Sequence, residues 1–415
     1  MILTQSFRAK QPKSLLDELN RESGRIYTLT MVEHWRIKSR KDIWLSQFGA
    51  MRINDALAGD SILHAHSKDA SQQAFYKACK TSKILIAQEV PDVKYPHKRK
   101  FYRTTVWKKS GIKVKDDTMF LAKARGLDPV KVKLPETLKV FEFNEVKLVY
   151  NQGSSKYYWF VSYEDNVIIP KPKGQEVVAV DLGEVHPAAV CSLKESQVIS
   201  CRELRSIIQG RNKKVSEIDK KKEECEKGSK RRKKLQRTKN KISAKFKLKQ
   251  RDICHKVSRA IVDFAEEQKA SKIVIGDVRK IADKIALSKS SNQKISQWPH
   301  GIVQNYVTYK AKQKGIEVKI IDESYTSQSC PCCGNLKKPK GRMYKCSKCG
   351  WVGHRDGQVG APNILSLELF GELSRVLVPE VKYRHPYLIS RGKRSRVDTT
   401  EIAGNSCGLS EASGF

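Results

Sequence analysis

The stretch that decides the fold of this chain reads Val177-Val178-Ala179-Val180-Asp181-Leu182-Gly183. Its four consecutive apolar residues predict a short strand that is buried on both faces, as in a sheet covered by helices. An acid stands directly at the end of this strand, and the glycine that follows lets another backbone or a ligand come close. Asp181 is therefore a candidate functional residue at the edge of an α/β sheet.

Two further acids lie at the ends of core elements of the same domain. Glu323 comes shortly after the apolar segment 318–321, and Asp356 lies in His354-Arg355-Asp356, just before a predicted last helix over 359–377. Carboxylates that gather at one edge of a sheet can hold two Mg²⁺ ions about 4 Å apart, the arrangement that hydrolyses phosphodiester bonds. Asp181, Glu323 and Asp356 are therefore the predicted catalytic residues and magnesium ligands.

The position of the second acid stays open at this point. In an RNase H-like order of elements it ends the fourth strand, here 273–276, but Gly276 occupies that place and Asp277 follows it. The fourth and fifth strands are parallel neighbours about 4.8 Å apart in that topology, so Glu323 at the end of the fifth can reach the same metals. Asp277 is the alternative, although it is one residue out of phase with the strand, and Asp322 ranks behind both.

A cluster of cysteines separates the second and third acids. Cys330, Cys333, Cys346 and Cys349 have the spacing C-x2-C-x12-C-x2-C, which predicts a closed tetrahedral zinc site with a structural role. Cys332 offers a further thiol, but Gly334 and Gly350 directly follow Cys333 and Cys349, as expected where metal-binding knuckles turn. The remaining cysteines are scattered, and the total of 11 is odd, which argues against a disulfide framework.

The charge of the chain indicates a polyanionic partner. Lysine and arginine number 81 against 44 acids, a formal net charge of +37. Such an excess favours nucleic acid over a membrane, since no stretch of ~18 apolar residues and no broad apolar amphipathic helix is visible. The start of the chain lacks the apolar core of a signal peptide, so we expect a cytoplasmic, nucleoid-associated protein without a membrane partner.

The strongest basic run lies between Lys230 and Arg251, where 12 of 22 residues are basic and none is acidic. Leu235, Ile242 and Phe246 fall on one helical stripe, which predicts a packed helix with a cationic outer face, followed by a second amphipathic helix around 257–265. Such a face neutralises phosphates and carries little sequence information. The predicted nucleic-acid contacts are Lys230, Arg231, Arg232, Lys233, Lys234, Arg237, Lys239, Lys241 and Lys245.

Four motifs resemble those of one protein family. They are Val180-Asp181-Leu182-Gly183-Glu184-Val185-His186-Pro187, Ile275-Gly276-Asp277-Val278, the run 325–334 that begins Tyr325-Thr326-Ser327-Gln328, and the run 354–364 that begins His354-Arg355-Asp356. Together they resemble the TnpB (OrfB) proteins of insertion sequences, compact relatives of the type V CRISPR effectors. The first motif is similar to the branch that travels with serine-recombinase transposons.

The resemblance implies a fold and a division into domains. The fold is an α/β RNase H-like (RuvC) domain with an inserted zinc ribbon, plus an N-terminal wedge β-barrel interrupted by a helical recognition lobe. The implied ranges are 1–11 and 91–170 for the wedge, 12–90 for the recognition lobe, 175–323 and 352–379 for the RuvC domain with a bridge-like basic helix at 230–251, 324–351 for the zinc ribbon, and 380–415 for a basic disordered tail.

The resemblance also implies an activity. TnpB-like proteins bind a guide RNA from the transposon end and cut double-stranded DNA that matches it, next to a short target-adjacent motif. Asp181 corresponds to the first RuvC acid and Asp356 to the third. Many members have Glu at the position of Gly276, while some branches carry it at the place of Glu323.

Two other functions share parts of these patterns. One is an RNA-guided DNA-binding repressor without nuclease activity, for which Gly276 is the motive. The other is a DDE-type transposase, which has the same fold and metals, but the run from Tyr325 to Cys333 speaks against it. Oligomeric state and target motif have no signature in the sequence.

Overall fold

The computed structural model describes residues 2–139, 141–165, 168–278 and 288–386. The chain divides into two compact units, Met1–Val167 and Ile168–Phe415. None of the described helices is both long and apolar enough to cross a membrane.

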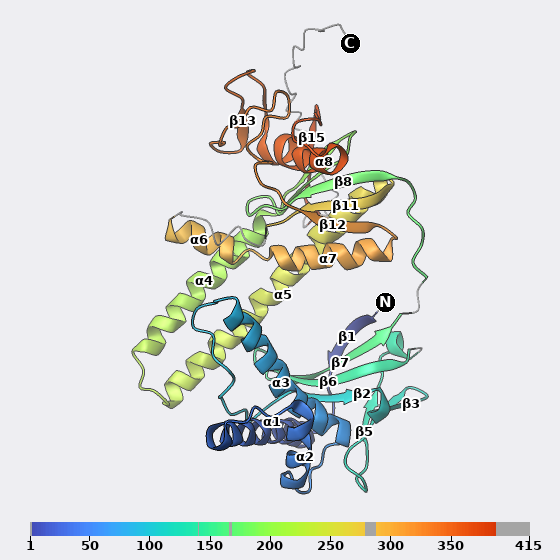
Figure 1. Cartoon of the computed structure of the whole chain (residues 1–415), viewed down its shortest axis with the longest axis vertical. Helices are drawn as coiled ribbons and strands as arrows, with labels where there is room; N and C mark the ends of the chain where they lie inside the picture. Colours follow the sequence, from blue (N-terminus) through green and yellow to red (C-terminus); the bar gives the residue numbers. More distant parts are fainter. Residues whose placement is uncertain (1, 140, 166–167, 279–287, 387–415) are drawn as a thin grey trace. The chain divides into compact units, whose positions relative to one another are not determined.

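The first unit combines three helices with two antiparallel sheets (Figure 1). The helices are α1 (Lys13–Lys41), α2 (Gln47–Leu57) and α3 (Ala65–Ala87), and all three lie within residues 12–90, where the resemblance implies a helical segment. One sheet has the order β1-β7-β6-β2 and the other β3-β4-β5. The strands are β1 (Ile2–Arg8), β2 (Thr105–Lys108), β3 (Ile112–Lys115), β4 (Thr118–Leu121), β5 (Val130–Lys133), β6 (Phe143–Asn151) and β7 (Lys156–Glu164).

Local chemistry explains the longest hairpin of this unit. β6 and β7 meet in the turn after Asn151, whose side-chain oxygen accepts hydrogen bonds from the backbone N–H groups of Gly153 (2.9 Å) and Ser154 (3.1 Å). Trp107 and Trp159 are completely buried in the core that the strands share. These two aromatic residues are therefore core residues.

The second unit is built on a six-stranded sheet with the order β12-β11-β8-β9-β10-β15. The central strand β8 (Glu176–Asp181) contains the apolar stretch 177–180, and it pairs in parallel with β11 (Ala270–Gly276). β11 pairs in parallel with β12 (Glu317–Ile321), while β9 (Ala188–Cys191) and β10 (Ser196–Ile199) continue the sheet in antiparallel pairs. The fourth and fifth strands are therefore parallel neighbours, as predicted.

Helices cover both faces of this sheet (Figure 1). Long helix α5 (Lys230–Glu267) and helix α7 (His300–Gln313) pack on the face to which Val178 and Val180 point. Helix α8 (Ala361–Phe370) packs on the opposite face, against Ala179. Because side chains alternate along a strand, Asp181 continues the series of Ala179 and belongs to the α8 face.

The remaining elements of this unit are short or lie outside the sheet. Helix α4 (Arg202–Glu223) runs beside α5, and α6 (Lys289–Ser296) precedes α7. A small hairpin joins β13 (Met343–Lys345) and β14 (Val352–His354), and one π-helical segment, Arg355–Gly360, leads into α8.

Three details differ from the sequence predictions. The basic run and the following amphipathic stretch form one continuous helix, α5, because no residue between them breaks a helix. The last helix ends at Phe370 instead of 377, since Gly371 adopts a left-handed conformation with φ 75°.

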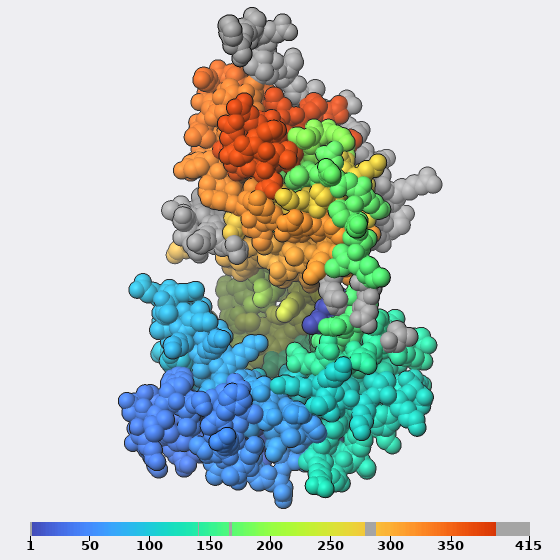
Figure 2. Space-filling model, turned by 45° about the vertical axis from the view of Figure 1, so that its right-hand side comes forward, coloured from blue at the N-terminus to red at the C-terminus, as the bar shows by residue number. Residues whose placement is uncertain are grey.

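The third difference concerns the tail predicted from residue 380. Residues Val381–Arg384 form strand β15, which pairs in parallel with β10 and buries Val381. In the space-filling view, the red atoms near the end of the described chain adjoin green atoms from the start of the second unit (Figure 2). The prediction of a disordered tail is therefore wrong for 380–386, and the rest of that range, 387–415, lies outside the described residues.

Candidate active site and metal centre

The three predicted acids line one cleft of about 450 Å³. Asp181 is the last residue of β8, Glu323 follows β12 by two residues, and Asp356 lies in the first turn of the π-helical segment. The parallel pairing of β8, β11 and β12 brings the ends of these strands to the same edge of the sheet. The structure therefore brings together three acids that are far apart in the sequence.

The side chain of Glu323 occupies the space beside Gly276. A Cβ atom built on Gly276 would stand 2.3 Å from Oε2 and 3.1 Å from Cβ of Glu323, and 3.0 Å from Cδ1 of Ile364 on α8. Gly276 thus faces α8, as Asp181 does. An acid side chain at position 276 and the present side chain of Glu323 would compete for the same volume.

A second glycine lies against Asp181. A Cβ atom built on Gly360 would stand 2.2 Å from Oδ2 of Asp181. Gly360 ends the π-helical segment, and such segments occur frequently at functional sites. The backbone of this segment therefore approaches the acid at a distance that only glycine permits.

The electrostatics of Asp181 reflect a crowded set of carboxylates. Burial raises the pKa of this carboxyl well above its ordinary value, and the nearby charges of Glu323 and Asp356 raise it further. Arg355 and Arg342 oppose this shift. An acid whose pKa is raised by burial and by neighbouring carboxylates is typical of catalytic clusters and of sites that receive a cation.

Glu323 shows the same pattern. Burial, followed by the charges of Asp277 and Asp322, raises the pKa of Glu323 to about 7. Its Oε2 atom is buried and has no hydrogen-bond partner within the described parts of the chain. A buried oxygen without a partner, beside a second carboxyl group, fits a hard divalent cation such as Mg²⁺, which binds carboxylate oxygens.

The alternative acids lie outside this cleft. Asp277 follows β11, and its backbone N–H donates to the carbonyl of Ile321 at 2.8 Å. Asp322 accepts hydrogen bonds from the backbone N–H (3.1 Å) and hydroxyl (2.8 Å) of Ser324, so it stabilises the turn after β12. Neither residue is among those that line the cleft of Asp181.

Two arginines hold Asp356. Arg342 donates from Nη1 to both carboxylate oxygens, at 2.8 and 3.2 Å, and Arg355 donates from Nε at 3.2 Å. Arg342 belongs to the segment between the two cysteine pairs and also lines the cleft. Sequence reasoning missed it, because nothing distinguishes one arginine among 81 basic residues.

Two histidines complete the surroundings of Asp356. His186, His354 and Asp356 are all buried, and their ligand-type atoms lie within 4.8 Å of one another. The backbone N–H of Gly357 donates to Nδ1 of His354 at 3.1 Å, while burial lowers the pKa of His186 to about 4. Both histidines lie inside the family motifs quoted above. That position is the signal from which the sequence could have identified them as site residues.

The four cysteines form the second cluster. Their sulfur atoms lie within 4.8 Å of one another, with 3.7 Å between Cys330 and Cys349 and 3.6 Å between Cys333 and Cys346. Gly334 and Gly350 have φ values of 70° and 74°, as the tight knuckles require. The described cluster thus contains Cys333, the cysteine that directly precedes Gly334.

The surroundings of Cys346 favour a thiolate. Burial works against its ionisation, but hydrogen bonds from the backbone N–H groups of Cys349 and Lys348, together with those from the thiols of Cys333 and Cys349, lower the pKa of Cys346 to about 6. A thiolate among three other sulfur atoms fits a soft divalent metal ion held by four protein ligands.

The basic residues of α5 fall into two groups. Seven of the nine predicted contacts are exposed: Lys230, Arg231, Lys233, Lys234, Arg237, Lys241 and Lys245. The other two bind α4 and its C-terminal turn. Lys239 donates to both carboxylate oxygens of Asp219 (2.8 and 2.6 Å), and Arg232 donates to the carbonyls of Lys222 (2.5 Å) and Cys225 (3.0 Å).

Family models match two parts of the chain, most of them within the second unit. Residues 160–282 match a model described as a probable transposase, OrfB_IS605, and residues 300–364 match the Cas12f1-like TNB domain. These ranges include Asp181, Glu323, Asp356 and the cysteine cluster.

Curated relatives and solved structures point the same way. A TnpB-like protein of Methanocaldococcus jannaschii is 29% identical over 220 residues, which cover 50% of this chain and 77% of that protein. The CRISPR-associated endodeoxyribonuclease Cas12f1 of Sulfoacidibacillus thermotolerans is 32% identical over 117 residues, 26% of each chain, so this chain matches only about a quarter of that relative's length.

The fold is shared with a solved effector complex. Cas12f1 in its complex with guide RNA and target DNA matches 81% of this chain and 80% of its own, with a TM-score of 0.53 and 12% identity. Residues 160–282 and 300–364 of the chain are therefore similar to TnpB-like proteins and to the related type V CRISPR effector Cas12f1.

Proposed function

We propose that this protein is an RNA-guided, metal-dependent DNA endonuclease of an insertion sequence. It cuts double-stranded DNA that matches a guide RNA from the transposon end, next to a short target-adjacent motif. The observation that carries the proposal is the meeting of Asp181, Glu323 and Asp356 in one cleft, with Oε2 of Glu323 buried and without a partner in the described chain. The similarity to the endodeoxyribonuclease Cas12f1 supports an endonuclease.

Each of the three acids comes from a different part of the fold. Asp181 and Glu323 come from neighbouring regions of one sheet edge, and Asp356 comes from the segment before α8. These three side chains would hold two Mg²⁺ ions. When bound, such ions activate a water molecule and stabilise the charge that develops on the scissile phosphate.

The arginines and glycines prepare this cleft. Arg342 and Arg355 orient the carboxylate of Asp356 through charge-assisted hydrogen bonds. Gly276 and Gly360 leave the room in which Glu323 and Asp181 stand. The chain therefore fixes the positions of its acids before a substrate arrives, which lowers the cost of reorganisation during the reaction.

Zinc in the four-cysteine cluster would be structural, because four protein ligands leave no open position. We assign residues 324–351 to this zinc ribbon, residues 1–11 and 91–170 to the wedge, and residues 12–90 to the recognition lobe. The exposed cations of α5 would lie along nucleic-acid phosphates, while base pairing with the guide selects the target.

The test is plasmid cleavage by protein that is co-expressed with its own transposon-end RNA, in Mg²⁺. Wild type, Glu323→Ala and Asp277→Ala are compared, with Asp181→Ala as the inactive reference. Loss of cutting in Glu323→Ala but not in Asp277→Ala supports the proposed site. Loss only in Asp277→Ala leaves the nuclease in place and refutes the assignment of the second acid.

The same assay separates the alternatives. A wild-type protein that occupies the matched DNA without nicking it is a guided repressor, and one that joins DNA ends is a strand-transfer transposase. The repressor alternative depends on Gly276, because this residue occupies the expected position of the second acid. The carboxylate of Glu323 lies where a side chain at position 276 would stand, which favours cleavage.

A further inference from the structure

A hollow of about 550 Å³ lies along α1 in the first unit. One side comes from α1, where Arg21, Arg25, Leu29 and Val32 contribute, and the other comes from the segment 99–102. Neither the nuclease cleft nor the basic helix includes any of these residues. The roles proposed above for the cleft and the basic helix therefore do not explain the hollow.

The segment beside the hollow is fixed to one stripe of α1. The backbone N–H of Arg103 donates to the carbonyl of Asn20 at 2.9 Å. Thr28 donates its hydroxyl to the carbonyl of Lys100 (3.1 Å) and accepts from the N–H of Lys100 (3.0 Å). Between them, a Cβ atom on Gly24 would stand 2.7 Å from the carbonyl oxygen of Lys100, so glycine is needed at this contact.

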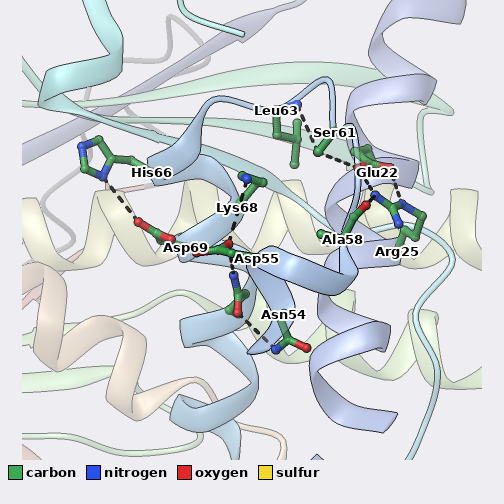
Figure 3. Close-up of polar contacts among 11 residues, drawn as sticks. Glu22, Arg25, Asn54, Asp55, Ala58, Ser61, Leu63, His66, Lys68 and Asp69 are labelled. Carbon is green, nitrogen blue, oxygen red and sulfur yellow. Dashed lines mark hydrogen bonds and ion pairs between the residues drawn. The ribbon is translucent and has the colours of Figure 1, made fainter. Parts of the chain in front are cut away.

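The basic groups around the hollow are ordered in part by their neighbours. Arg25 donates twice to the carboxylate of Glu22 and once to the carbonyl of Ala58, each at 2.8 Å (Figure 3). Ser61 donates to the same carboxylate at 2.6 Å. The charge of Glu22 is neutralised in this way, and no acid lines the hollow. The electrostatic potential in the hollow is therefore positive.

Two further cations remain available. Within the described chain, the side chains of Arg99 and Lys100 form no ion pair. Arg21 donates from Nε to the hydroxyl of Tyr102 at 2.9 Å, and its guanidinium lies 5.5 Å from the centre of that ring. A cationic rim thus surrounds an apolar interior.

Aromatic rings are exposed at the same place. Phe101 is 82% exposed and Tyr102 is 42% exposed, although the backbone that carries them is fixed to α1. An exposed aromatic ring on a fixed segment, beside unpaired cations, suits a nucleotide, because the base stacks on the ring and the phosphate meets the cations.

We propose that this hollow binds an unpaired nucleotide of RNA, with its base against Phe101 and its phosphate near Arg99 and Lys100. RNA is the occupant that the chemistry favours, because proteins recognise RNA largely through unstacked bases in loops, bulges and ends. The identification of RNA as a partner rests on the proposed function, while the hollow itself does not.

Photo-crosslinking tests the proposal. The probe is a single-stranded RNA of about 12 nucleotides with a central 4-thiouridine, irradiated with the full-length protein and mapped by mass spectrometry. We expect a crosslink on the segment that contains Phe101 and Tyr102. Phe101→Ala should lower the yield of this crosslink at least about 5-fold, because loss of base–aromatic stacking weakens binding by about that factor or more. Phe101→Tyr should restore the yield.

Phe48→Ala is the matched control, since Phe48 on α2 is 72% exposed and lies outside the hollow. It should leave the yield unchanged, and neither variant should alter the melting temperature, because neither ring is buried. A crosslink that is absent from this segment, or that falls equally in Phe48→Ala, overturns the proposal.

Two more outcomes are decisive. A 4-thiothymidine DNA of the same length that crosslinks as well as the RNA overturns the assignment to RNA. Cleavage by the wild-type protein is measured separately. A wild-type protein that cuts but gives no crosslink on this segment refutes this site alone, and one that gives the crosslink but never cuts refutes the nuclease alone.

Discussion

The carboxylate of Glu323 fills the space in which a side chain at Gly276 would stand, with only 2.3 Å between Oε2 and the position of the missing Cβ. The two residues belong to neighbouring parallel strands and their extensions, with Gly276 paired to Ile321 in the register. Gly276 lacks a side chain at the end of β11, and the carboxylate of Glu323, just beyond β12, uses the space that this leaves. The two residues therefore depend on each other.

Gly276→Ala should lower the rate of DNA cleavage at least about tenfold, because the added methyl group displaces the carboxylate and misplaces it by a fraction of an ångström or more. The measurement is the single-turnover cleavage rate with saturating Mg²⁺. Gly301→Ala is the control, since a Cβ there meets nothing within 4 Å. A Gly276→Ala enzyme with the wild-type rate would contradict the steric coupling.

The raised pKa of Glu323 predicts a pH dependence of stability. A carboxyl that is bound to its proton more tightly in the folded state makes the unfolded state relatively more stable as pH rises. The window runs from the ordinary pKa of 4.5 to about 7. With zinc retained and Mg²⁺ omitted, the wild-type melting temperature should fall across this window.

Glu323→Gln should remove part of this fall, by a free energy on the order of 2 kcal/mol, because the amide does not titrate. Thermal melts at pH 5 and pH 8 check the difference between the two proteins. Mg²⁺ should restore stability at pH 8 in the wild type only. Parallel pH curves for both proteins would show that Glu323 does not carry the effect.

Cys346→Ser should lower the zinc content and the free energy of unfolding, since a metal site contributes its binding energy to folding. Cys225→Ser is a suitable control, because the thiol of Cys225 donates to the carbonyl of Lys221 and lies outside the cluster. Metal content per protein is measured after dialysis. One full equivalent of zinc in Cys346→Ser would refute the set of ligands.

The two groups of cations on α5 should respond differently to neutralisation. Lys241→Gln combined with Lys245→Gln should reduce the slope of log affinity against log salt by about two and leave the melting temperature unchanged. Lys239→Gln should instead lower the melting temperature, because it breaks the ion pair with Asp219. Titrations of RNA at several salt concentrations, with parallel melts, separate these results.

Much of the nuclease core follows from short-range patterns. Val177 to Val180 are apolar without interruption, which identifies the central strand, and the parallel pairing of 273–276 with 318–321 is the reason that Glu323 could be placed beside Asp181. The spacing of Cys330, Cys333, Cys346 and Cys349 likewise predicts a cluster without any knowledge of the fold.

Other features depend on partners that are distant in the sequence. Strand β15 has only four residues, two of them basic, and its partner β10 lies far earlier in the chain, so no local pattern reveals it. The π-helical turn before α8 has no hydrophobic period of its own. Arg342 becomes recognisable only when the hairpin of β13 and β14 brings it to Asp356.

The contact between Gly360 and Asp181 gives a way to sort natural variants of this chain. Any larger residue at position 360 would meet the carboxylate of Asp181 at 2.2 Å, so substitution there removes the geometry even where every acid is retained. A variant with all three acids but with Ala or Ser at 360 should therefore be classed with inactive proteins. An inventory of acids alone would count it among the active ones.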